Sequence, residues 1–238
     1  YGEGENQVRA IDHTSMQVQH GEFVAVVGRS GSGKSTLLHM LGGLDRPDSG
    51  KVYIEGRDIF DLKDEQLAVF RRRKIGFIFQ DYNLLDNMTL QDNIALPLSL
   101  NGKRSREIIE KTKQMASLFG LSEHLNKYPY QLSGGQKQRG ASARALITNP
   151  RIIFADEPTG ALDSKSSKDL LISLKKANES GNATILMVTH DAYSASYAKQ
   201  VYMLSDGAIK CRLNHSGERQ KFYDEILSLL ASMGSEQE

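Results

Sequence analysis

The feature that most constrains the fold is a glycine-rich segment, Gly28 to Ser35 (GRSGSGKS), which follows an apolar run and precedes a helical pattern. Glycine has no Cβ, so the backbone N–H groups of such a loop can turn toward one anion, and Lys34 adds a full positive charge. The helix that follows contributes the positive end of its dipole. The segment therefore predicts a strand, a phosphate-binding loop and a helix in series within a layered α/β fold.

The rest of the chain alternates short apolar runs with helical patterns, as in a sheet with helices on its faces. We expect a helix over 36–41 and strands at 8–11, 23–27, 52–54, 75–79, 152–155 and 184–188. Residues 81–150 differ, because they show helical periodicity, most clearly at 106–119 and 136–147, and no strand pattern. We therefore predict a catalytic core at 1–80 and 151–212, a helical subdomain at 81–150 and a C-terminal helix within 213–238.

Composition excludes several classes of protein. Thirty Lys and Arg residues against 29 Asp and Glu residues give a net charge of +1, which argues against a nucleic-acid partner. The single Cys211 excludes an internal disulfide and agrees with a reducing compartment. No apolar run reaches the roughly 18–20 residues that span a bilayer, and no leader pattern is present. Because the sequence starts at Tyr1 without Met, we expect a short segment with an edge strand to precede it.

An apolar run at 152–155 ends in two adjacent carboxylates, Asp156 and Glu157. Open α/β sheets bind their ligands at the carboxyl ends of strands, where neighbouring side chains point in different directions. Asp156 is suited to hold Mg²⁺ together with the Ser35 hydroxyl, and Glu157 is suited to polarise an attacking water. Two acids at a strand end are often only a turn. The phosphate loop makes the catalytic interpretation the stronger one.

Two further polar residues, Gln80 and His190, follow predicted core strands at positions where they could sense a γ-phosphate. Alone, such residues are more often structural. The remaining histidines show no metal-ligand spacing, which argues against a zinc site. A separate segment, Leu132 to Gln136 (LSGGQ), offers a hydroxyl and backbone amides at a helix start. The first loop has no use for these groups, so the segment looks like a second half-site for the nucleotide of another copy.

These motifs together resemble the full motif set of ATP-binding-cassette ATPases, and the likeness covers nearly the whole chain. The resemblance implies a P-loop (RecA-like) core with an antiparallel β subdomain and an inserted helical subdomain. It also implies a head-to-tail homodimer that sandwiches ATP and Mg²⁺. ATP would contact the residues of the phosphate loop and of the partner's signature segment, namely Gly28, Arg29, Ser30, Gly31, Ser32, Gly33, Lys34, Ser35, Thr36, Ser133, Gly134, Gly135 and Gln136.

The resemblance also assigns individual roles. Glu157 would be the general base and His190 the γ-phosphate switch. Gln80 would contact Mg²⁺ or water and link the core to the helical lobe, and Lys34 would bind the outer phosphates. Ser35, Gln80 and Asp156 would surround the metal. Asp163 would couple the two sites across the dimer, and Tyr1 would stack on adenine. The preference for ATP over GTP follows from the family and not from residue chemistry.

Shorter motifs at 44–47, 71–72 and 158–163 resemble the macrolide-export and lipoprotein-release branch. Those at 77–86, 133–139 and 153–165 most closely resemble the antimicrobial-peptide (bacitracin) resistance type, and residues 213–214, 219–220 and 222 resemble the ending of that group. That type implies a cytoplasmic-face ATPase of a bacterial membrane permease, often working with a sensor histidine kinase. Three functions stay open: this transporter engine, with this or another cargo; a soluble cassette acting on DNA or ribosomes; and a cassette that binds ATP without turnover. Intact Glu157 and His190 argue against the last, and charge argues against the second.

Two surface patterns have two interpretations each. Apolar residues at helical spacing over 219–233 predict either a helix packed on its own core, which we favour, or a regulatory or permease-binding helix. The basic run 71–74 predicts a solvated face, which we favour, or a contact with lipid head groups or acidic permease loops.

Overall fold

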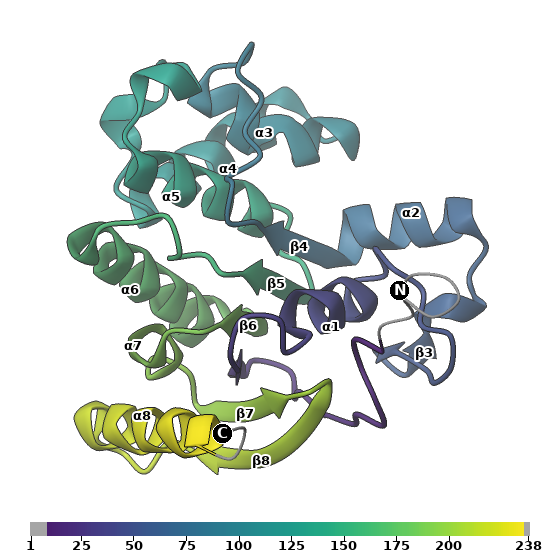
Figure 1. Cartoon of the computed structure of the whole chain (residues 1–238). Coiled ribbons are helices and arrows are strands. Elements are labelled where there is room, and N and C mark those ends of the chain that lie inside the picture. Colours follow the sequence, from purple (N-terminus) through teal and green to yellow (C-terminus); the bar gives the residue numbers. More distant parts are fainter. Residues whose placement is uncertain (1–8, 236–238) are drawn as a thin grey trace.

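The structure is a computed structural model that describes residues 9–235, so Tyr1 lies outside the described residues. Its centre is a six-stranded sheet in the order β4-β5-β6-β1-β7-β8 (Figure 1). Neighbouring strands are parallel except for the antiparallel pair β7–β8. The strands are β1 (Phe23–Val27), β4 (Ile75–Ile78), β5 (Ile152–Asp156), β6 (Ile185–Thr189), β7 (Gln200–Ser205) and β8 (Ala208–Asn214).

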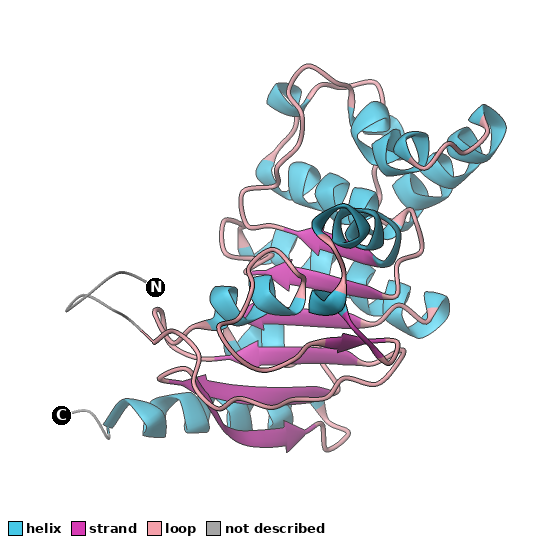
Figure 2. Ribbon diagram, turned by 90° about the vertical axis from the view of Figure 1, so that its right-hand side faces the viewer, coloured by secondary structure: helices cyan, strands magenta, loops and turns pink. Residues whose placement is uncertain are grey.

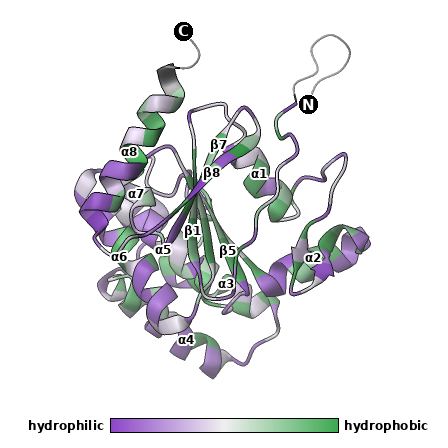
Figure 3. Ribbon diagram, turned by 90° about the horizontal axis from the view of Figure 1, so that it is seen from below, coloured by the Kyte–Doolittle hydropathy of each residue, from purple (hydrophilic) through white to green (hydrophobic). Residues whose placement is uncertain are grey.

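The helices cover both faces of this sheet, which is why its central strands are continuous apolar runs. All five residues of β1 and of β6 are buried. Figure 3 shows α1 (Lys34–Leu41) and α2 (Asp64–Lys74) on one side of the sheet. The other side carries α5 (Gly134–Leu146), α6 (Ser164–Gly181), α7 (Ala192–Ala195) and α8 (Arg219–Ser235).

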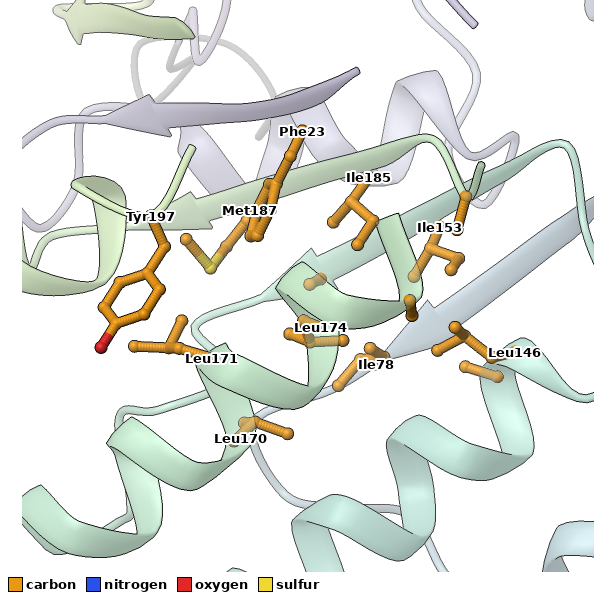
Figure 4. Packing of buried hydrophobic residues seen from close by; sticks show 14 of the residues in the cluster. Phe23, Ile78, Leu146, Ile153, Leu170, Leu171, Leu174, Ile185, Met187 and Tyr197 are labelled. Atoms are coloured by element: carbon orange, nitrogen blue, oxygen red, sulfur yellow. The ribbon is translucent and has the colours of Figure 1, made fainter. Parts of the chain in front are cut away.

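The larger core cluster lies between the sheet and α6, where Leu170, Leu171 and Leu174 meet strand residues such as Ile153 and Ile185 (Figure 4). The opposite face of the sheet packs against Leu37 and Leu38 of α1. Apolar side chains cover both faces of the central strands, so a polar ligand can reach these strands at their ends. The carboxyl-end edge is where β1 passes into α1 and where β5 ends in Asp156.

The helical subdomain follows β4 and stacks above one edge of the sheet (Figure 2). It contains α3 (Leu90–Leu100), α4 (Ser105–Leu118) and α5, with short 3₁₀ turns at Ser122–His124 and Pro129–Gln131. Thr89 caps α3 by accepting a hydrogen bond from the Asp92 N–H. The predicted helices at 106–119 and 136–147 are confirmed with their boundaries shifted by one or two residues.

Several expectations differ from the structure. Residues 9–11 form no strand, because the following segment is tied to the β7–β8 turn through Asp12 N–H and the Thr14 hydroxyl, both donating to the Gly207 carbonyl. The antiparallel subdomain is represented, within residues 9–235, by the short pair β2 (Tyr53–Ile54) and β3 (Arg57–Asp58), followed by a 3₁₀ turn at Ile59–Asp61. The C-terminal helix begins at Arg219, because β8 continues to Asn214.

The C-terminal helix α8 packs on its own core, as the favoured interpretation stated. Phe222 and Ile226 are fully buried in the larger cluster. The guanidinium of Arg219 lies over the rings of Tyr193 and Tyr197, 5.1 and 4.8 Å from their centroids. Within the described chain, no helix has the length and apolar character needed to cross a membrane.

We expect Phe222→Ala to lower the free energy of unfolding by about 3–5 kcal/mol, because it removes a fully buried ring and leaves a cavity. Leu227→Ala is the matched control, since Leu227 is on the same helix and 48% exposed; we expect a change within about 0.5 kcal/mol. Urea unfolding followed by circular dichroism measures both. Equal effects of the two substitutions would show that α8 is not part of the core.

Candidate nucleotide site

The phosphate loop lies between β1 and α1, at the carboxyl-end edge of the sheet. Gly33, the residue before α1, has a φ of 97°, and a Cβ there would collide with the Ala10 carbonyl. A Cβ at Gly28 would likewise collide with the Leu204 carbonyl. Both positions therefore require glycine, one for its backbone angle as well as its size and the other for its size alone.

Lys34 is nearly buried at the start of α1, with 7% of its side chain exposed. Its Nζ donates a hydrogen bond to the Arg29 carbonyl at 2.9 Å and lies 3.9 Å from Glu157 Oε1. Burial lowers the pKa of the Lys34 ammonium, while the nearby carboxylates of Glu157 and Asp156 raise it. The loop thus carries a desolvated cation at its centre, where its attraction for an anion is stronger than in bulk water.

Asp156 ends β5 next to this loop. Its Oδ1 accepts a hydrogen bond from the Ser35 hydroxyl at 2.8 Å, and its Oδ2 lies 3.6 Å from His39 Nε2. The sequence prediction that Ser35 and Asp156 lie together therefore agrees with the geometry. A hydroxyl and a carboxylate side by side are oxygen donors of the kind that Mg²⁺ takes from proteins, alongside waters and substrate phosphates.

Glu157 and His190 meet at the ends of β5 and β6. His190 Nδ1 lies 3.0 Å from Glu157 Oε1, and the His190 backbone N–H donates to Oε2 at 3.3 Å. Glu157 has a φ of 42°, which is unfavourable for a residue with a side chain. These contacts hold the carboxylate toward the phosphate loop, in reach of Lys34.

The phosphate loop opens onto a cleft of about 1060 Å³. Most of the predicted site residues line it, namely Gly28, Arg29, Ser30, Gly31, Gly33, Lys34, Ser35, Thr36, Gln80, Glu157 and His190. Ser32, although part of the loop, is buried and does not line the cleft. Sequence reasoning missed another part of the wall, made by Arg9, Ala10, Asp206, Gly207 and Leu230. No motif marks these residues, and folding alone brings them together.

The signature segment lies elsewhere in the chain. Ser133 is exposed and caps α5, with its hydroxyl accepting a hydrogen bond from the Gln136 N–H at 3.3 Å. Gly135 lies against α6, where a Cβ would collide with the Ser166 hydroxyl. Asp163 caps α6, and hydrogen bonds from the backbone N–H and hydroxyl of Ser166 lower the pKa of its carboxyl. Among described residues, the cleft lining includes none of Ser133, Gly134, Gly135, Gln136 and Asp163.

The segment 79–83, on both sides of Gln80, is held by α5, the helix that starts at the signature segment. Gln138 donates a hydrogen bond to the Phe79 carbonyl at 3.0 Å. The Arg144 guanidinium donates to the carbonyls of Tyr82 at 3.1 Å and Asn83 at 2.6 Å. Tyr82 and Asn83 have φ angles of 62° and 49°, and burial lowers the pKa of Arg144. The charged bonds therefore stabilise a loop whose backbone is otherwise unfavourable.

Comparison with known proteins decides the family. Residues 11–160 match the family described as ABC transporter. The chain belongs to the ABC transporter family. Over its full length it is 47% identical to the bacitracin export ATP-binding protein BceA of Halalkalibacterium halodurans, and the match spans 94% of that protein. Over 94% of its length it is 46% identical to the macrolide export ATP-binding/permease protein MacB of Hyphomonas neptunium, of which it spans 34%.

A solved structure agrees with the fold of this ABC transporter cassette. The ATP-binding cassette MJ0796, in a dimeric post-hydrolysis state bound to ADP and Pi, matches with a TM-score of 0.84 and 40% identity. The match covers 92% of this chain and 96% of that chain. The predicted P-loop cassette fold, the ATPase class and the resemblance to the bacitracin and macrolide branches are confirmed. The chain is an ATP-binding and ATP-hydrolysing subunit of the ABC transporter family.

Proposed function

We propose that ATP binds with its phosphates at Gly28 to Ser35 and is hydrolysed there by water activated by Glu157. The Glu157 carboxylate is 13% exposed and makes two contacts with His190, which fix the orientation of its oxygen atoms. It can take a proton from a water in line with the γ-phosphate, while Lys34 offsets the charge that develops on the phosphate oxygens. His190 and Gln80 both line this part of the cleft and are suited to sense the γ-phosphate.

Mg²⁺ fits the pair formed by Ser35 and Asp156; of these, Ser35 lines the nucleotide cleft, as Gln80 does. In that place the ion would neutralise charge on the phosphate oxygens. The Ser35 hydroxyl and Asp156 carboxylate are already within hydrogen-bond distance of each other, so little rearrangement is needed to bring both oxygens to one cation. The acid next in sequence, Glu157, remains available for proton transfer because it points to His190 and Lys34 instead.

The working unit that we propose is a homodimer with two composite sites. One observation carries this proposal: the described signature residues do not line the phosphate cleft of their own chain. Ser133 is exposed, and α5 begins at Gly134, so the N–H groups of its first turn and the positive end of its dipole suit an anion that the phosphate cleft of the same chain does not place there. The dimeric state of MJ0796 supports this arrangement. Asp163, at the start of the neighbouring helix α6, would then lie at the interface.

We further propose that this cassette drives a bacterial membrane permease in resistance to antimicrobial peptides of the bacitracin type, from the cytoplasmic face. The support is the 47% identity to BceA over the whole chain. A sensor histidine kinase acting through the permease is part of the same proposal, whereas nucleic acid is not, given the net charge of +1. A second candidate is macrolide-type export, which the 46% identity to MacB supports.

Purification of the tagged chain from membranes in mild detergent tests the transporter assignment. We expect an integral-membrane permease to copurify, and loss of the chain to sensitise cells to bacitracin without a change in macrolide sensitivity. Sensitisation to macrolides alone would favour the second candidate. Recovery of ribosomes or DNA in place of a permease would contradict both.

A further inference from the structure

The C-terminal helix α8 contributes a side chain to the nucleotide cleft. Leu230 lines this cleft together with the phosphate loop, although α8 lies far outside the residues 11–160 that match the family. Figures 1 and 2 place the C-terminal end of α8 at the same edge of the sheet as the start of α1. The helix therefore ends beside the phosphate loop and not on a remote surface.

The position of Leu230 is set by packing. Phe222, Ile226 and Leu230 are spaced four residues apart and so lie along one face of α8. The first two are fully buried, and Leu230 is half-buried against the same core cluster. At the other end of the helix, Arg219 donates a hydrogen bond to the Ser196 hydroxyl at 3.3 Å and covers the rings of Tyr193 in α7 and of Tyr197 just after it. α8 is thus fixed along its length, and its tip is held at the cleft.

The lining of the cleft combines the phosphate loop with a second wall of different composition. The phosphate loop offers backbone amides and a cation, which suit the anionic end of a nucleotide. Leu230 belongs to the second wall with Arg9, Ala10, Asp206 and Gly207, which adjoins the phosphate loop, and its side chain adds a large apolar group there. A nucleoside triphosphate anchored by its phosphates must extend its sugar and base along the remaining cleft.

We infer that Leu230 packs against the nucleoside portion of the bound nucleotide, so that α8 is part of the nucleotide site. This inference rests on the proposed placement of the triphosphate at Gly28 to Ser35. An apolar contact adds affinity through buried area but does not select one base over another, because it reads no hydrogen-bonding groups. The contact also makes nucleotide binding sensitive to the position of α8.

The test compares ATP with inorganic tripolyphosphate, which has the anionic chain and no nucleoside. Binding is measured by isothermal titration calorimetry with Mg²⁺, on full chains that are monomeric by sedimentation. We expect Leu230→Ala to weaken ATP binding about 5- to 10-fold and to leave tripolyphosphate binding unchanged. Leu230→Met should restore ATP affinity. Leu227→Ala, on the exposed side of the same helix, should bind both ligands like the wild type.

Lys34→Ala separates the inference from the proposal beneath it, because it should weaken both ligands. If Lys34→Ala weakens neither, the phosphate placement is wrong whatever Leu230 does. If Lys34→Ala behaves as expected but Leu230→Ala binds ATP like Leu227→Ala, the inference about α8 is wrong. An equal loss of affinity for both ligands in Leu230→Ala would also overturn it. Thermal unfolding midpoints confirm that each variant is folded at the temperature of titration.

Discussion

Glu157→Gln is expected to reduce the turnover of ATP about 10²- to 10⁴-fold while leaving ATP binding intact. The amide keeps the shape of the side chain and can still accept from the His190 backbone N–H, which lies 3.3 Å from Oε2 in the native protein. It has no lone pair basic enough to take a proton from water at neutral pH. Because hydrolysis would no longer separate the protomers, we expect ATP-bound dimers to accumulate.

Phosphate release at saturating ATP measures the turnover, and analytical ultracentrifugation with and without ATP measures the dimer. Glu179→Gln is the matched control, since it makes the same chemical change on the exposed side of α6, where Glu179 pairs with Lys175 at 3.7 Å. It should behave like the wild type in both assays. Full turnover in the Glu157→Gln chain, with no dimer at high ATP, would mean that another group is the base.

Lys34→Ala is the second substitution with a large expected effect, and here the loss falls on binding. The native ammonium is nearly buried and donates to the Arg29 carbonyl of the loop, so it can make charge-assisted hydrogen bonds to phosphate oxygens away from bulk water. Loss of about 1.5–3 kcal/mol of such interaction corresponds to an ATP affinity lower by about 10- to 100-fold. Turnover should fall as well, because the same charge stabilises the transition state.

Fluorescent-nucleotide titration measures the affinity. Lys113→Ala, which removes an exposed lysine from α4 in the helical subdomain, should leave it unchanged. Since Lys34 also lies 3.9 Å from Glu157, its loss removes the ammonium beside that carboxylate, and the unfolding midpoint must be measured in parallel. Wild-type ATP affinity in a folded Lys34→Ala chain would mean that ATP does not bind at the phosphate loop.

The sequence predicted those parts of the site whose geometry is local. The loop from Gly28 to Ser35 is set by its neighbours in sequence. Asp156 and Glu157 follow a short, unbroken apolar run, which is typical of a buried central strand. The rule that strand ends share one edge then brings these segments together without further information. The structure adds the partners, such as the 2.8 Å hydrogen bond from Ser35 to Asp156.

The sequence could not predict contacts that depend on how distant backbones meet. Arg144 binds carbonyl groups of a loop 61 and 62 residues earlier in the chain, and a carbonyl leaves no trace in residue type. Leu230 looked like one more apolar residue of an amphipathic helix, since periodicity shows which face is buried but not what covers it. The strand expected at 8–11 had the right composition, yet residues 9–11 hydrogen-bond no neighbouring strand, and composition alone does not supply one.

The most direct test of the account mixes two inactive chains, one with Lys34→Ala and one with Ser133→Arg, under conditions where hybrid dimers are shown to form by energy transfer between labels. Each hybrid should contain one site with an intact phosphate loop facing an intact signature segment. We therefore predict that the mixture regains part of the wild-type ATPase activity, although neither chain is active alone. Hybrid dimers that form fully and hydrolyse no ATP would contradict the composite site.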